Sequence, residues 1–228
     1  MAAIRLDSDE RRKAIVRAAV PLFARKGFAG TTTRELAEAA GISEALLFKH
    51  FPSKQSLYRE IRQLGCEGDP ALETLATLPP STATLICMMR FMVRHFLGVA
   101  ACGQGELDSR LRLVAHSFLE DGVYARELFE AVSERVLPLF EASCEAAVAS
   151  GDIVAPSGSG RPRNLFWFAQ HVPAMLALAG LPGRNCVPCD GTLDELADEA
   201  TVFILRGIGM SEAAIAAAAG QRHREAAD

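Results

Sequence analysis

Hydrophobic positions along the chain recur at the three- to four-residue spacing of α-helices, and no segment alternates as a strand would. In residues 7–26, Ile15, Ala19 and Leu22 fall on one helical stripe. Three shorter helical segments follow, at 32–40, 43–50 and 53–64. Capping boxes, in which Asp or Thr precedes Glu by three positions, begin helices at Asp7–Glu10, Thr32–Glu35 and Thr192–Glu195.

A Gly- and Pro-rich stretch at 65–81 separates these short helices from longer ones. The longer helices are predicted at 82–101, 108–120, 125–149, 163–180 and 192–210, before an Ala-rich tail at 213–227. The pattern therefore predicts an all-α protein with an N-terminal domain at 1–66 and a larger helical domain at 67–228.

Charge is distributed unevenly between the two predicted domains. The 228 residues carry a net charge of −4, but residues 1–64 hold 12 Lys and Arg against 7 Asp and Glu, a net +5. The remaining chain holds 12 against 21, a net −9. A basic N-terminal module on an acidic body is typical of a nucleic-acid-binding domain attached to a partner domain.

Residues 32–51 have the pattern of a helix-turn-helix, two short helices joined by a three-residue turn that begins at Gly41. Ala37 and Ala40 are small enough for the two helices to cross closely. Gly41 supplies a backbone conformation that a Cβ would disfavour. The second short helix then presents its N-terminal turn outward, where unpaired N–H groups suit a phosphate.

The sequence resembles the TetR family of bacterial transcriptional regulators over roughly residues 10–62. The resemblance rests on Gly27-Phe28, Thr32-Thr33, Leu36-Ala37, Ala40-Gly41-Ile42-Ser43, Phe48-Lys49-His50-Phe51 and Ser53-Lys54 with Leu57. It implies a homodimer whose paired reading heads bind double-stranded DNA at a palindromic operator. It also implies a ligand-binding and dimerisation domain that releases the DNA when a small-molecule effector binds. Most members of the family are repressors.

The resemblance assigns DNA-contacting roles to eight residues. Thr33 falls at a phosphate contact, Arg34 at a phosphate or base edge, and His50 and Lys54 at contacts to the DNA backbone. Base readout is expected from Ser43, Glu44, Ala45 and Lys49. For Glu44 three roles stay open: it accepts from cytosine N4, it opposes nearby phosphates, or it is a solvated bystander. Phe48 stands where the family usually has Tyr, so one hydroxyl-to-phosphate bond is in doubt.

Methionine, aromatic and histidine side chains in the larger domain suit a plastic apolar pocket for an apolar or aromatic effector. The candidates are Met88, Met92, His95, Phe96, His116, Phe166, Trp167 and His171. The alternative for each is an ordinary core position. An apolar stripe on the last long helix, together with the nearly all-apolar helix at 163–180, favours a dimer interface over an intramolecular core. The stripe contains Leu193, Leu196, Ala197, Ala200, Ile204, Leu205 and Ile208.

Other chemistry finds little support. No nucleophile–base motif, phosphate-binding glycine loop or metal-ligand set is apparent, so we expect no enzyme, metal or cofactor. Cys186 and Cys189 leave a redox switch as an alternative means of regulation, as does a partner protein. The uncharged run at 164–183 contains Pro and His and favours a buried helix over a membrane span. With no secretory signal expected, we place the protein in the cytoplasm.

Overall fold

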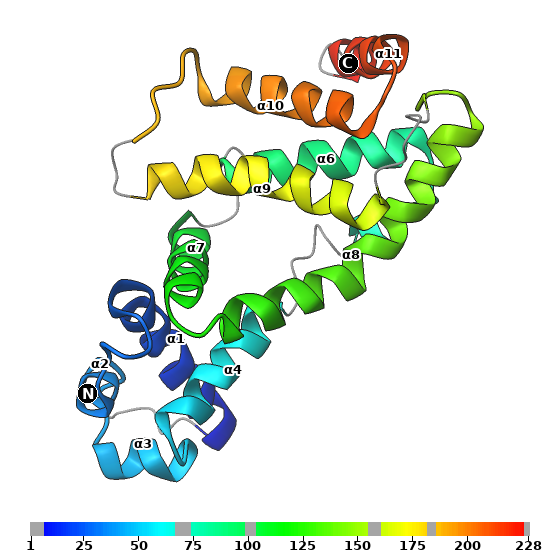
Figure 1. Ribbon diagram of the computed structural model, residues 1–228. Coiled ribbons are helices and arrows are strands. Elements are labelled where there is room, and N and C mark those ends of the chain that lie inside the picture. Colours follow the sequence, from blue (N-terminus) through cyan, green and yellow to red (C-terminus); the bar gives the residue numbers. More distant parts are fainter. Residues whose placement is uncertain (1–6, 67–73, 99–103, 155–160, 182–185, 226–228) are drawn as a thin grey trace. The chain divides into compact units, whose positions relative to one another are not determined.

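The computed structural model describes residues 7–66, 74–98, 104–154, 161–181 and 186–225 (Figure 1). The described residues are helical apart from turns, connections and an isolated antiparallel bridge between Ile153 and Met210. No helix in these ranges is long and apolar enough to cross a membrane. The predicted all-α fold is therefore confirmed.

Ten helices are described. They are α1 (Ser8–Lys26), α2 (Thr33–Ala39), α3 (Glu44–His50), α4 (Lys54–Cys66), α6 (Thr82–Phe96), α7 (Gln104–Leu119), α8 (Val123–Ala149), α9 (Pro162–Gly180), α10 (Leu193–Ile208) and α11 (Glu212–Glu225). Each corresponds to a predicted segment, and most ends differ by one to four residues. The segment predicted to end at residue 101 ends as α6 at Phe96, and residues 99–101 lie outside the described residues.

The helix starts follow from local hydrogen bonds that the sequence specifies. Asp7, Thr32 and Thr192 each accept a bond from the backbone N–H three residues on, and the Glu at that position bonds back to the cap. All three predicted capping boxes are thus confirmed. Ser53 Oγ likewise accepts from Ser56 N at 3.1 Å just before α4 begins.

The described residues divide into two compact units. Unit 1 contains residues 1–67 and 105–131, and unit 2 contains 68–104 and 132–228. Residues 105–131 pack with the N-terminal segment, which a single division after residue 66 does not anticipate. The functional division into a DNA-binding and an effector-binding domain stays a prediction.

The core of unit 1 gathers side chains from every helix of the unit. Ile15, Phe23, Leu36, Leu47 and Leu57 are buried in it, and α7 and α8 add Leu113 and Tyr124. Phe23, Phe28, Tyr58 and Tyr124 form a chain of ring contacts with centroid separations of 5.0 to 6.1 Å. The core therefore fixes the short helices α2 and α3, which are too short to be stable alone.

The core of unit 2 lies among α6, α8, α9, α10 and α11. It includes Leu85 and Met89 of α6, Phe140 of α8 and Phe166 of α9. Five of the residues expected at the dimer interface are buried in this core instead, namely Ala197, Ala200, Ile204, Leu205 and Ile208. For these five residues the interpretation as an intermolecular surface was wrong, because the helix uses them to pack within its own unit, whereas Leu193 is exposed.

Candidate nucleic-acid interface

The turn between α2 and α3 has the geometry that the sequence predicts. Gly41 has a φ of 65°, in the left-handed region that favours glycine, and nothing lies within 4 Å of the position a Cβ would take. The Ile42 amide donates to the Ala37 carbonyl at 3.0 Å, which closes the turn back onto α2. Ser43 Oγ accepts from Leu46 N at 3.2 Å and caps α3.

Arg12 of α1 bonds both to α4 and to the end of α3, and so connects three helices of the candidate reading head. Its Nε and Nη2 donate to both carboxylate oxygens of Glu60 on α4, at 3.0 and 2.8 Å. Its Nη1 donates to the His50 carbonyl at the end of α3, at 2.7 Å, and its guanidinium lies 4.2 Å from the centre of the Phe51 ring. The hydrogen bond to Glu60 raises the pKa of Arg12, and the same bond lowers the pKa of Glu60.

Lys54 makes a second tie, at the start of α4. Its Nζ donates to the Phe28 carbonyl at 2.7 Å and to the Thr31 carbonyl at 2.9 Å, and it lies 4.3 Å from the centre of the Phe28 ring. These contacts occupy two of the three ammonium donors and hold the connection that leads into α2. The sequence predicts that Lys54 contacts the DNA backbone. One Nζ donor remains for such a contact, which stays a prediction.

A second ion pair lies at the start of α2. Glu35 bonds to Lys26 of α1 and to the backbone N–H and hydroxyl of Thr32. The Lys26 ammonium and then the Thr32 backbone N–H lower the pKa of Glu35 to about 2. The carboxylate is therefore charged at neutral pH and serves both the cap of α2 and its attachment to α1.

The residues predicted to contact DNA differ in the contacts that they make within the protein. Ala45 and Lys49 are exposed, and Lys49 makes no hydrogen bond or ion pair that involves other described residues. Arg34 is exposed and pairs with Glu38 through Nε at 2.9 Å. Thr33 Oγ1 donates to Glu44 Oε1 at 2.7 Å, a contact that sequence reasoning missed. Ser43, Glu44, Ala45 and Lys49 all lie on or beside α3.

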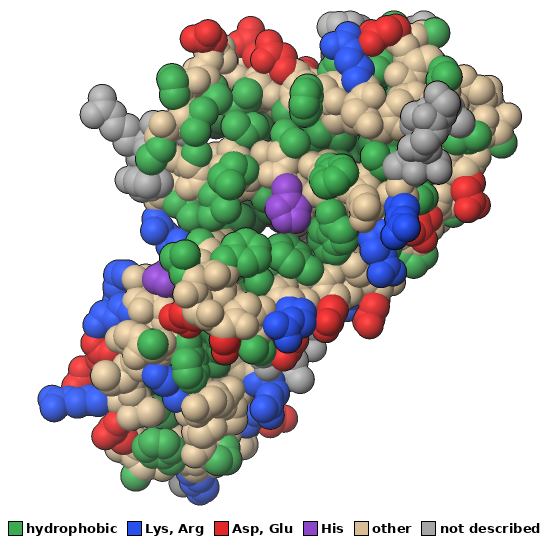
Figure 2. All heavy atoms as spheres, viewed as in Figure 1, with side chains coloured by type: hydrophobic (Ala, Val, Ile, Leu, Met, Phe, Trp, Pro, Cys, Tyr) green, Lys and Arg blue, Asp and Glu red, His purple; other side chains and the backbone are tan. Residues whose placement is uncertain are grey.

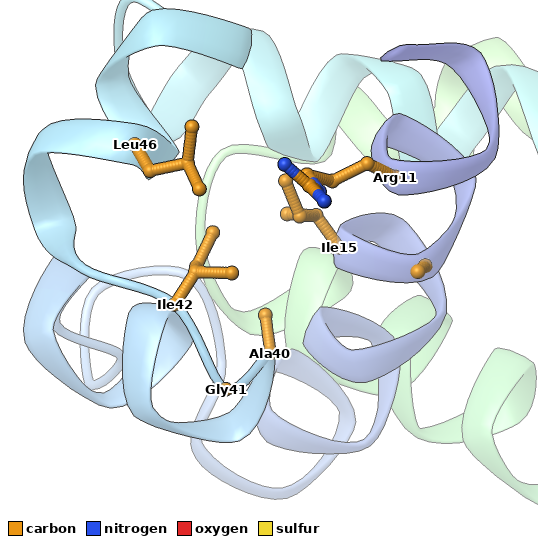
Figure 3. Close-up of a pocket in the computed structure, with 7 residues that line it drawn as sticks. Arg11, Ile15, Ala40, Gly41, Ile42 and Leu46 are labelled. Atoms are coloured by element: carbon orange, nitrogen blue, oxygen red, sulfur yellow. The ribbon is translucent and has the colours of Figure 1, made fainter. Parts of the chain in front are cut away.

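An open pocket of about 360 Å³ lies between α1 and the α2–α3 turn (Figure 3). Arg11 and Ile15 of α1 face Ile42 and Leu46 across it. The pocket belongs to unit 1, whereas sequence reasoning expected the effector pocket in the larger domain.

Of the eight predicted effector residues, seven belong to unit 2. Met88 and Phe166 are buried in the core of unit 2, with Met92 and Trp167 packed against it. His95 contacts the rings of Phe91 and Phe96, at centroid separations of 5.7 and 5.8 Å. His171 is exposed on α9 and bonds through Nδ1 to the Trp167 carbonyl. The eighth, His116, belongs to unit 1.

Two buried polar side chains in unit 2 are absent from the site residues that the sequence predicts. Ser143 Oγ of α8 and Gln170 Oε1 of α9 have no hydrogen-bond partner among the described residues. Buried polar atoms are rarely left without a partner, so each of these two side chains is a position at which unit 2 can bond to a ligand. In a sequence, a polar residue on an otherwise apolar helix is only a weak sign of a binding site. The burial of these two side chains, which the structure shows, is what distinguishes them from surface residues.

The cysteines of the redox alternative are accessible. Cys186 and Cys189 are exposed in the segment before α10, whereas burial raises the pKa of Cys144 to about 12 and makes that thiol unreactive. Within the described ranges, no group of three or more His, Cys, Asp or Glu residues is placed to hold a metal ion.

Residues 15–61 match the family model described as bacterial regulatory proteins, tetR family. The chain is 37% identical over 133 residues to the transcriptional repressor KstR2 of Rhodococcus jostii, which covers 50% of this chain and 65% of the relative. It spans less than two thirds of the length of the curated relatives that it matches. These relatives are named as transcriptional regulators, not as enzymes.

Solved structures extend the similarity of fold beyond the N-terminal segment. A tetR-family regulatory protein from Rhodococcus RHA1 has a TM-score of 0.66 at 18% identity, with 89% of this chain and 99% of that chain covered. The regulator FadR of Bacillus subtilis in complex with stearoyl-CoA has a TM-score of 0.61 at 12% identity, with 86% and 98% covered. These solved structures thus share the all-helical fold of this chain. Residues 15–61 are therefore similar to the N-terminal segment of TetR-family regulators.

The two lysines of the candidate interface offer a direct test of the tie made by Lys54. We expect Lys54→Met to lower the free energy of unfolding by about 1–2 kcal/mol, because two carbonyls lose a charged donor. Lys49→Met is the matched control, since Lys49 is exposed on α3, and it should change stability by less than about 0.5 kcal/mol. Denaturant unfolding measures both. Equal effects of the two substitutions would contradict a structural role for Lys54.

Proposed function

We propose that this protein is a sequence-specific DNA-binding transcriptional regulator that represses from a palindromic operator. The observation that carries the proposal is the helix-turn-helix of unit 1, with α3 capped, anchored at its end by Arg12 and exposed along Ala45 and Lys49. The local excess of basic residues favours approach to a polyanion although the whole chain is acidic. Cytoplasmic localisation accompanies this proposal, because the operator is there.

A homodimer accompanies the proposal, since two heads are needed to bind a palindrome. Phe168 and Met175 stand seven residues apart on α9, and each is about two thirds exposed. Phe203 of α10 is equally exposed. Hydrophobic side chains gather over α9 and α10 on the face that Figure 2 shows. We place the dimer interface on this face, in place of the buried stripe of α10.

Unit 2 is the proposed site of a small, largely apolar or aromatic effector. Ser143 and Gln170 would orient a polar group of that ligand, within a core otherwise made of aliphatic and aromatic side chains. Met88, Met92, His95, Phe96, Phe166, Trp167 and His171 remain proposed contacts, and the role of His116 in unit 1 stays a prediction from the sequence. The effector would release DNA by binding more tightly to a conformer whose two heads are misplaced.

The second candidate is regulation by the Cys186–Cys189 pair or by a partner protein. The exposure of both thiols favours the redox form of this alternative. If oxidation abolishes operator binding by the wild type but not by Cys186→Ser, redox control is distinguished from effector control.

Affinity selection of duplexes from a random library tests DNA binding. The wild-type protein should select an inverted repeat, and Lys49→Ala should change the preferred bases within each half-site. Lys13→Ala is the control, because Lys13 is an exposed lysine on α1, and the preferred sequence should not change. A selection that yields no preferred duplex would contradict the proposal. Equal weakening on every sequence by Lys49→Ala would remove Lys49 from the readers.

A thermal-unfolding screen against fatty acyl-CoA, aromatic acids and organic cations tests the effector site. A ligand at 100 times its Kd should stabilise the folded protein by about 2.7 kcal/mol. Gln170→Leu should reduce that gain, whereas Gln55→Leu, at an exposed position on α4, should not. If operator DNA stabilises the protein and no ligand class does, the thiol switch becomes the better account.

A further inference from the structure

The first residues of α2 and α3 are joined by a side-chain hydrogen bond. Thr33 Oγ1 donates to Glu44 Oε1 at 2.7 Å. Thr33 is half-buried and Glu44 is exposed at the first position of α3. Arg34, the next residue of α2, pairs with Glu38 and also attracts the Glu44 carboxylate.

The chemistry of this contact limits what Thr33 can do. A threonine hydroxyl has one proton to donate, and an ionised carboxylate has none. While Thr33 donates to Glu44, it cannot also donate to a DNA phosphate. The contact therefore conflicts with the predicted contact between Thr33 and a phosphate. Thr33 instead holds the Glu44 carboxylate in position.

The position of Glu44 determines which DNA groups its carboxylate can accept from. The N-terminal residues of a recognition helix are the ones that reach base edges in the major groove. The donors exposed there are the amino groups of cytosine N4 and adenine N6, while guanine presents acceptors. A carboxylate gains a hydrogen bond from the first two and is repelled by the acceptors of guanine and by the phosphates.

We infer that Thr33 and Glu44 form a base-reading unit, in which Glu44 accepts from a cytosine N4 amino group and Thr33 holds the carboxylate in place. Cytosine is favoured over adenine because the adenine N7 acceptor beside N6 would repel the second carboxylate oxygen. The inference rests on the proposed function. It assigns Glu44 to specificity and Thr33 to positioning, and it predicts that Glu44 disfavours DNA that lacks the donor.

Duplex selection with the intact protein, followed by competition binding, tests the inference. Wild type should prefer cytosine at one position of each half-site, and Glu44→Ala should reduce that preference by about tenfold while binding to unrelated duplex tightens. Glu38→Ala is the matched control, since it removes an exposed carboxylate from α2 and should leave the base preference unchanged.

Thr33→Val should weaken the same base preference, and Thr33→Ser should restore it because the hydroxyl returns. The dependence of affinity on salt should stay as in wild type for both variants. If Thr33→Val instead weakens binding to every duplex without changing base preference, Thr33 contacts phosphate and the inference is overturned. Unchanged preference in Glu44→Ala overturns it as well, whereas failure of wild type to select any duplex overturns the proposed function itself.

Discussion

The arrangement of helices in the candidate reading head depends on the contacts of the Arg12 guanidinium. One side chain from α1 bonds to both carboxylate oxygens of Glu60 on α4, to the carbonyl that ends α3, and to the face of the Phe51 ring. A seven-residue helix has little stability of its own, so its direction must come from such external contacts. Because the side chains of Arg12 and Glu60 are about one third exposed, solvent weakens the charge attraction, and the planar, multiple bonding geometry contributes most.

Arg12, Lys54 and Lys26 illustrate a common use of basic residues in unit 1. Each is a cation that bonds to groups within the protein, although the sequence assigns Lys54 to the DNA backbone. Lys49, in contrast, extends from α3 without such a partner among the described residues. The basic residues of the N-terminal segment thus fall into two groups, one that bonds within unit 1 and one that is exposed to solvent. A count of basic residues cannot separate these groups.

The helices and their starts could be predicted because they depend on residues close in sequence. Thr32 and Glu35, or Gly41 alone, specify their structure locally, and the structure confirms these predictions. The contacts of Arg12 with Glu60 and of Thr33 with Glu44 join residues 48 and 11 positions apart, and no periodicity reveals them. The buried stripe of α10 was misjudged for a related reason, since an apolar face has the same pattern whether it packs within the chain or against another copy.

Amide hydrogen exchange at the end of α3 tests the central role of Arg12 most directly. The Phe51 amide donates to the Leu47 carbonyl at 2.8 Å, next to the carbonyl that Arg12 holds. In Arg12→Met, exchange at Phe51 should accelerate by about tenfold, because a charged hydrogen bond that restrains the helix end is lost. Exchange in α10 of unit 2 should remain as in wild type. Unchanged protection at Phe51 would contradict the account, since α3 would then be held by its core contacts alone.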